Sequence, residues 1–214
     1  SAAMMLTGNI VVALLGTAVF FSYGPAVVGL SMAYMGTWFK TYRETAAISE
    51  LFEKLLERTS PFTAYVYALG NFGEGRNVTG AVVTAFLVTV VLAVGTCCLY
   101  WLRPSEAAGK AMAFPKTENV IRVLIVIPVG VVFGMFFFAL RATVIWLLVG
   151  AVVGTVLAHC IIEIIYRMDF RRLFDRKIYL AGCLLVTLGL SMAGFKDWFG
   201  YDTWMPDTGK IQSM

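Results

Sequence analysis

Two residues with spacing suited to chemistry are His159 and Glu163, which stand four positions apart, and Arg167 follows four positions later. On a helix these three side chains share one face. An ionisable residue inside an apolar segment is a candidate functional residue by default. A metal site is not expected, because the pair lacks the third protein ligand that zinc requires. We interpret Glu163 and Arg167 as an ion pair in the last turns before a basic loop, which gives them a structural role.

Catalytic motifs are absent from the rest of the chain. The sequence contains no HExxH, no GxSxG, no Walker loop and no paired carboxylates within an apolar segment. Cys97 and Cys98 are adjacent, while Cys160 and Cys183 stand alone in apolar segments, a spacing that favours neither disulfides nor a zinc site. We therefore expect no enzyme activity and no cofactor bound by this chain.

Long stretches without Asp, Glu, Lys or Arg dominate the sequence. They comprise residues 1–39, 79–102, 123–140, 142–162 and 178–195. A bilayer core of roughly 30 Å needs about 20 apolar helical residues, so stretches of this length predict membrane spans. The sequence thus predicts an all-α fold, a polytopic transmembrane helix bundle of about five spans.

Composition supports the same fold class. Hydrophobic residues make up 59% of the chain and charged residues 14%, which is far from a soluble domain of this size. The net charge of +4 is small, and the basic residues lie in connections between spans, without a continuous basic stripe. We expect a lipid bilayer as the surroundings of the chain and no nucleic-acid partner.

The first 39 residues are long enough for one broken helix or a short hairpin. Gly24 and Pro25 stand where either arrangement would bend, because proline removes a helical hydrogen bond. We favour one span from about Asn9 to Phe39 with a kink at Gly24-Pro25.

Residues 44–58 show the pattern of an amphipathic helix, which Thr59-Ser60-Pro61 ends. The apolar positions recur at i, i+3, i+4, i+7 and i+8, namely Ile48, Leu51, Phe52, Leu55 and Leu56. Two placements remain open at this point. The helix either lies at the outer membrane surface and dips partly into it, or it packs on the bundle as an ordinary external helix.

Two pairs of glycines have the spacing of helix contacts in membranes. Gly130 and Gly134 form one Gly-x-x-x-Gly pattern, and Gly150 and Gly154 form a second. Small residues at this spacing let neighbouring helices approach closely.

Charge in the connections predicts the orientation. The connections 103–118 and 166–177 are rich in Lys and Arg, so they are expected on the cytoplasmic side. The tight turn at Arg141, the segment 40–77 and the tail 196–214 then lie outside, and the start of the chain lies in the cytoplasm.

Four short stretches give the sequence a family resemblance. They are LYWLRPSEAAGKAMAF at 99–114, TSPF at 59–62, IEIIYRMDFR at 162–171 and FGYDTWMPD at 199–207. Together they resemble permease subunits of ABC-2-type exporters from Gram-positive bacteria, the group with extra spans and a C-terminal extracytoplasmic domain. The resemblance implies an internal fragment of such a permease in the bacterial cell membrane.

The resemblance also implies a domain layout. Residues 1–102 would hold the last two core spans, with 44–67 as an outer re-entrant or interfacial segment. Residues 103–195 would hold a cytoplasmic loop and three further spans, and 196–214 the start of the extracytoplasmic region. Such a permease has no ATPase activity of its own, pairs with a second permease subunit, and is driven by a separate cytoplasmic ATP-binding subunit.

The two basic loops are the candidate contacts with that ATPase. Their residues are Arg103, Glu106 and Lys110 in the first loop, and Asp169, Arg171, Arg172 and Arg176 in the second. Charge that merely sets the orientation is the alternative explanation for each of them. Two other functions stay open, namely an ATP-independent channel or carrier and a membrane sensor or anchor subunit. Mid-span residues that are mainly Ser, Thr and Gly argue against ion-coupled transport.

Overall fold

The structure of the protein is a computed structural model, and it describes residues 7, 10–42, 45–73, 79–102, 115–167, 176–198 and 200–202. Seven helices and no strand occur in this part of the chain. They are α2 (Ile10–Trp38), α3 (Ala46–Thr59), α4 (Pro61–Gly73), α5 (Thr79–Leu102), α6 (Pro115–Arg141), α7 (Val144–Arg167) and α8 (Lys177–Phe195). The all-α fold class is confirmed.

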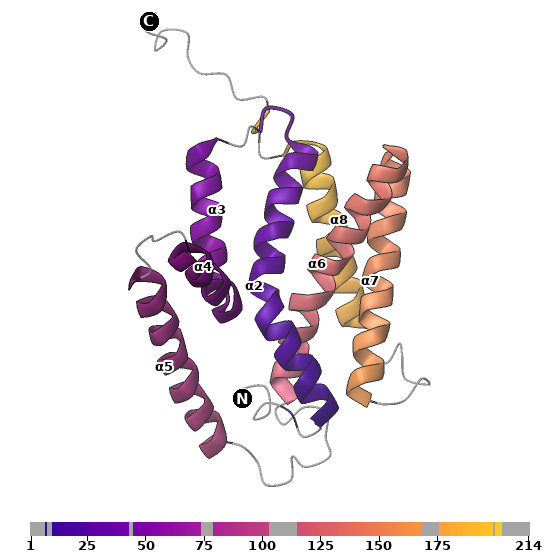
Figure 1. Cartoon of the computed structure of the whole chain (residues 1–214). Helices are drawn as coiled ribbons and strands as arrows, with labels where there is room; N and C mark the ends of the chain where they lie inside the picture. The colour runs from indigo at the N-terminus through magenta and orange to yellow at the C-terminus, as the bar shows by residue number, and fades with distance from the viewer. Residues whose placement is uncertain are drawn as a thin grey trace, which may run out of the picture.

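Four of these helices are long and apolar enough to cross a membrane, namely α2, α6, α7 and α8. Helix α5 has 24 residues and contains the further apolar stretch Ala85–Trp101. Figure 1 shows α2, α6, α7 and α8 side by side, with α3, α4 and α5 on the other side of α2. The expected membrane bundle of about five spans is thus confirmed.

Helix α2 is a single helix, and not a hairpin. Its 29 residues include Pro25, and Figure 1 shows the helix changing direction partway along its length. Proline is a usual cause of such a bend, since it removes a backbone hydrogen bond. The prediction of one long span through Gly24-Pro25 is confirmed.

The amphipathic segment forms α3 as predicted, but a second short helix, α4, follows it. Ser60 has an extended backbone between the two helices and accepts a hydrogen bond from the Phe62 N–H (3.2 Å), while Pro61 occupies the first position of α4. Serine before a helix and proline at its first position are both favoured. The sequence pattern does not indicate this second helix, because its residues are mostly apolar and show no clear helical period.

The turn between α3 and α4 lies against the middle of α2. The Ser60 hydroxyl donates to the Phe21 carbonyl (2.7 Å), and a Cβ on Gly24 would lie 2.6 Å from the Thr59 carbonyl oxygen. Only glycine permits this approach, so Gly24 serves as a docking position for the turn as well as a neighbour of the bend. Figure 1 shows α3 running beside one end of α2 and α4 crossing near its middle.

Helices α6, α7 and α8 pack closely around small residues. A Cβ on Gly154 would lie 2.4 Å from Phe133 Cβ, and one on Gly150 would lie 2.6 Å from the Phe133 carbonyl oxygen. A Cβ on Gly130 would lie 2.3 Å from Thr155 Oγ1. Both Gly-x-x-x-Gly patterns are therefore contact faces between α6 and α7, as expected.

Helix α6 begins about two turns before the predicted stretch 123–140, so the expected start of this span is corrected. The predicted span started at residue 123 because Glu118 and Arg122 interrupt the apolar run. In the structure α6 starts at Pro115, and both charged residues lie within the helix. The reason is that their charges are paired inside the bundle.

The end of the chain that the structure describes is attached to the end of α2. Asp202 accepts hydrogen bonds from the backbone N–H groups of Lys40 and Thr41 (both 3.0 Å) and from the Thr41 hydroxyl (2.6 Å). The rings of Phe39 and Tyr201 lie 5.0 Å apart. Residues 200–202, part of the stretch FGYDTWMPD, thus fix the segment after α8 to the segment after α2.

Close packing at Gly154 leads to a stability prediction. We expect Gly154→Ala to destabilise the bundle by about 1–3 kcal/mol, since the new methyl group forces Phe133 or the α6 backbone to move. Thermal unfolding in mild detergent measures the effect. Gly182→Ala on α8 is the matched control, because nothing lies within 4 Å of a Cβ there. Equal melting temperatures for the two variants would contradict the packing.

The contact of Asp202 predicts a pH dependence. Hydrogen bonds from Thr41 and Lys40 hold the pKa of the Asp202 carboxyl below its usual range. A lowered carboxylate pKa stabilises the contact above the ordinary aspartate value of about 4, and this stabilisation is lost as pH falls through the lowered pKa. Hydrogen exchange, corrected for intrinsic rates, should show the Lys40 and Thr41 amides losing protection in that acid window. In Asp202→Asn their protection should be weaker and independent of pH, and pH-independent protection in the unchanged protein would refute the assignment.

Candidate functional site: a buried charge cluster between α6, α7 and α8

A cluster of charged side chains lies inside the bundle near the start of α6. Arg122 of α6 and Glu163 of α7 are completely buried and form an ion pair through the Arg122 Nη2 and Glu163 Oε2 atoms. Arg122 Nη2 also lies 3.3 Å from Glu118 Oε1, one helical turn earlier. On the other side of Glu163, Arg167 Nε donates to Oε1 at 2.7 Å.

Helix α8 joins the cluster at its first turn. Arg176 Nη2 lies 3.2 Å from the Glu118 carboxylate, and Arg176 Nη1 donates to the Asn119 side-chain oxygen. Asn119 in turn donates to the Tyr179 hydroxyl at 3.0 Å. Tyr166 completes the site, because its ring centroid is 6.0 Å from Arg122 Cζ. The cluster connects all three helices at one end of the bundle.

The sequence prediction for Glu163 is partly confirmed and partly extended. The pair of Glu163 with Arg167 is present, but Glu163 is buried rather than exposed in the last turn, and its second partner is Arg122. Glu118 and Arg122 were not predicted as members of this site, because both precede the charge-free stretch that starts at residue 123. Their spacing of four residues was the available signal, since such a pair supports a helix that continues through them.

A row of polar side chains continues from the cluster along α7 and α8. On α7 it comprises Thr155 and His159, and on α8 Thr187 and Ser191, each pair spaced by four residues. All four are buried. The Thr155 hydroxyl donates to the Ala151 carbonyl at 2.7 Å.

Several of these buried polar atoms have no hydrogen-bond partner among the described residues. They are both ring nitrogens of His159, the hydroxyls of Thr187 and Ser191, and Nε and Nη1 of Arg122. Each such atom carries a desolvation cost of about 1–3 kcal/mol. Buried polar groups that break the packing rules in this way are typical of functional sites. The row from Arg122 to Ser191 is therefore the candidate functional site of the described chain.

What this site does chemically is limited by its groups. It holds guanidinium and carboxylate groups in pairs, one imidazole and several hydroxyls, and the described residues contain no group of three or more His, Cys, Asp or Glu side chains placed to hold a metal ion. The ion pairs join three helices, while the imidazole and the hydroxyls form the row of buried polar side chains within an apolar bundle. Holding helices together and providing polar contacts are the functions such an arrangement supports.

The other residues predicted from sequence fall into two groups. Arg103, Glu106, Lys110, Asp169, Arg171 and Arg172 lie outside the described residues. Arg176 is described, and its guanidinium is bound to Glu118 and Asn119 of α6. Arg176, directly before α8, thus joins the start of α8 to the start of α6 and to the cluster.

The central ion pair predicts a large stability effect. We expect Arg122→Met or Glu163→Gln alone to destabilise the bundle by about 3 kcal/mol, since each removes the buried partner of a completely buried charge and leaves it only Glu118 or Arg167. The double variant should lose less than the sum. Denaturant titration in detergent completes the cycle.

Lys54→Met is the matched control for this cycle. It breaks the pair of Lys54 with Glu50, whose side chains are 61% and 65% exposed, and should cost less than about 1 kcal/mol. Additive effects of Arg122→Met and Glu163→Gln would show that the two charges do not interact.

No family model, no curated protein and no solved structure matches this chain. The protein is a membrane protein, since four of its described helices are long and apolar enough to cross a bilayer.

Proposed function

We propose that this chain is part of the permease subunit of an ATP-binding-cassette transporter of the ABC-2 type, an exporter in a bacterial cell membrane. A separate cytoplasmic subunit binds ATP, and the permease moves its substrate by changing conformation. The observation that carries the proposal is the α3–α4 hairpin, which enters beside α2 and turns at the middle of that span. The family resemblance implies a re-entrant or interfacial segment at this position, between two core spans.

The backbone of the α3–α4 turn is covered in the way that an element at membrane depth requires. Irregular backbone is tolerated there only where protein or a water-filled cavity covers it. At the α3–α4 turn the Ser60 hydroxyl binds the Phe21 carbonyl, and the Thr63 hydroxyl donates to the Ser60 carbonyl at 2.9 Å. Side chains of the turn thus satisfy backbone groups close to α2. Interrupted helices that meet at mid-membrane are a common feature of transport sites.

The charge cluster gives the proposed mechanism a rigid part. A buried ion pair joins α6 to α7 at one end, and Arg176 joins the start of α8 to α6 there. Close contacts at Gly130 link α6 to both α7 and α8, so the three helices are expected to move as one body. Residues 103–114 and 168–175 lie outside the described residues, and by sequence they directly precede α6 and α8. In the proposal, ATP binding closes the partner ATPase, its surface moves these loops, and the three-helix body shifts relative to α2 and the hairpin.

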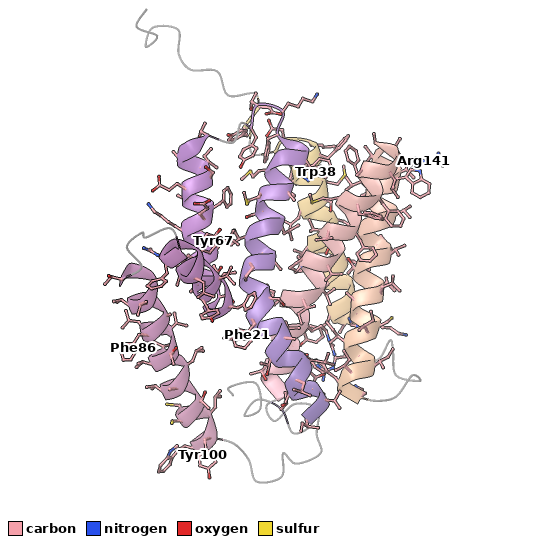
Figure 2. The ribbon with its side chains drawn as sticks, in the orientation of Figure 1. Phe21, Trp38, Tyr67, Phe86, Tyr100 and Arg141 are labelled. Atoms are coloured by element: carbon pink, nitrogen blue, oxygen red, sulfur yellow. The ribbon has the colours of Figure 1, made fainter. Side chains whose placement is uncertain are left out.

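The orientation in the membrane follows from the same charges. The end of the bundle that carries Arg167 and Arg176 faces the cytoplasm in this proposal, as the excess of basic residues favours. The opposite end, with Trp38 and Arg141 labelled in Figure 2, then faces outwards, together with the tail held by Asp202.

A second permease subunit is the proposed partner for α5. This helix packs on α4 and α3, and many of its large side chains are exposed, including Phe86 at 67% and Val91 at 69%. Figure 2 shows Phe86 and Tyr100 on the side of α5 away from the other spans. An apolar helix face of this size suits either lipid or another helix.

The row of buried polar side chains favours one alternative to the ATP-driven permease, namely an ATP-independent channel or carrier. The buried imidazole of His159 and the hydroxyls of Thr187 and Ser191 are groups that line ion paths in such proteins. Proteoliposomes that hold the purified chain without an ATPase separate the two functions. Substrate or ion flux that His159→Leu abolishes would favour the carrier and count against the ATP-driven permease.

The main prediction concerns the ATPase. Purification of the full-length protein from its native membrane should yield an ATP-binding protein at near-equal stoichiometry, identified by mass spectrometry. Charge reversal of Arg103, Glu106 or Arg171 should uncouple substrate from ATP hydrolysis, because these residues lie in the proposed contact loops. Arg141→Glu, at the other end of the bundle, is the matched control. A normal ATPase response in all three loop variants would remove the proposed contact surface, and isolation of the protein without an ATPase would overturn the function.

A further inference from the structure

Helix α3 carries its charged side chains on one face. It contacts α2, α4 and α5, and its half-buried apolar residues are Ile48, Phe52 and Leu56, spaced by four. At 100° per residue the charged residues fall on the opposite side of the helix. They are Glu50, Glu53, Lys54, Glu57 and Arg58. The charged face of α3 therefore points away from the helices on which α3 packs.

Helix α8 shows where the hydrocarbon core of the membrane ends. Its 19 residues are about 28 Å long at 1.5 Å per residue, so it crosses a core of roughly 30 Å only with its two ends at the two boundaries. Trp38 of α2 lies at the level of the last residue of α8, because its ring is 6.0 Å from that of Phe195. The boundary of the core at this end of the bundle thus lies near Trp38.

Helix α3 lies below this boundary. Its last residue, Thr59, packs against Gly24, which stands fourteen residues before Trp38, about 21 Å along α2. Half of the core measures about 15 Å, so the α3–α4 turn reaches the middle of the membrane even if α2 is tilted. Figure 1 shows the same arrangement, with α3 running beside the upper part of α2. The charged face of α3 therefore lies at membrane depth, and Arg58, next to Thr59, lies close to the middle.

Lipid does not suit a face of this kind. On membrane-insertion scales one charged side chain near the middle of the core offsets roughly five leucines. Helix α3 has only as many large apolar residues as charged ones, five of each. Snorkelling rescues charges near the membrane surface, but Arg58 stands at the end of α3 that is furthest from it. Charges at this depth occur where protein buries them or where water reaches them.

Water suits the charged face better than a protein partner does. Three glutamates alternate with one lysine and one arginine, so the face presents no block of one sign for a partner to complement. The Lys54 ammonium and the Glu50 carboxylate already pair within the helix at 2.6 Å, and both side chains are more than half exposed. Pairs four residues apart along a face of mixed sign are typical of a helix surface in water.

We propose that the charged face of α3 lines a water-filled vestibule, which opens on the outer side of the membrane and ends at the α3–α4 turn. A polar solute, or the polar part of an amphiphile, reaches the middle of the membrane by this route. The outward direction rests on the orientation in the proposed function, whereas contact with water at this depth does not. An ATPase is not needed for it, so the vestibule and the exporter function can fail separately.

Cysteine labelling of the full-length protein in its native membrane tests the vestibule. Glu53→Cys and Arg58→Cys place thiols on the charged face, where both native side chains are exposed. A charged, membrane-impermeant maleimide is added on the outer side, and mass spectrometry measures the rate peptide by peptide, so the exposed Cys97 and Cys98 do not interfere. Leu185→Cys is the control, because this residue is 74% exposed at the middle of α8.

The thiolate is the reactive form of cysteine and requires water, so both α3 positions should react at least about tenfold faster than Leu185→Cys. Rates equal to that of the control would overturn the proposal, and an uncharged, membrane-permeant maleimide then gives the reason. Fast reaction with this second reagent alone would place the face in lipid, and slow reaction with both would place it against a protein partner. If one of the two α3 variants does not fold, the other decides the question.

Discussion

The buried pair of Arg122 and Glu163 is the interaction on which the arrangement of α6, α7 and α8 depends. Neither charge has access to water, so each depends on opposite charges beside it within the bundle. Glu118, Arg167 and Arg176 surround the pair and extend it to the first turn of α8. In a bilayer, apolar surfaces gain little by leaving lipid for each other, so ion pairs and close packing must set which helices are neighbours. The cluster specifies the order and register of the three helices.

Glycine packing and the ion pair depend on each other. Gly130, Gly150 and Gly154 bring the α6 and α7 backbones close together, and that distance lets Arg122 reach Glu163 across the interface. The same close approach buries His159 and Thr155, which lie one and two turns before Glu163 on α7. The row of buried polar side chains thus arises because the polar residues of α7 lie on the face that packs against α6. These buried polar groups lower the stability of the fold, which is expected where polar groups serve function.

Much of the fold, but less of the site, could be predicted from the sequence. Charge-free stretches located α5 and α8 within one or two residues, because a bilayer penalises charge more strongly than any helix propensity favours it. The same rule moved the start of α6 to residue 123, since an isolated Arg122 is costly in lipid and only a partner on another helix removes that cost. Helix α4 was missed for a related reason: its polar contacts, through Ser60 and Thr63, are with nearby backbone and α2, and leave no periodic pattern. The pattern of a single sequence does not show which residues of different helices contact each other, so these contacts could not be predicted.

The two halves of α2 have different surroundings. Towards one end, Trp38 packs on Phe138 and Phe195, and the Tyr34 hydroxyl donates to the Leu190 carbonyl at 2.7 Å. Along its first half α2 faces an apolar groove that α6 and α7 line on the other side, and the Tyr23 hydroxyl donates to the Leu124 carbonyl at 3.0 Å. Helix α2 is bent at Pro25 and is separated from α6 and α7 by the groove along its first half, whereas the three-helix body cannot deform without exposing a buried charge. Relative motion in this molecule is therefore expected at the groove, between α2 with its hairpin and the body that carries the cluster.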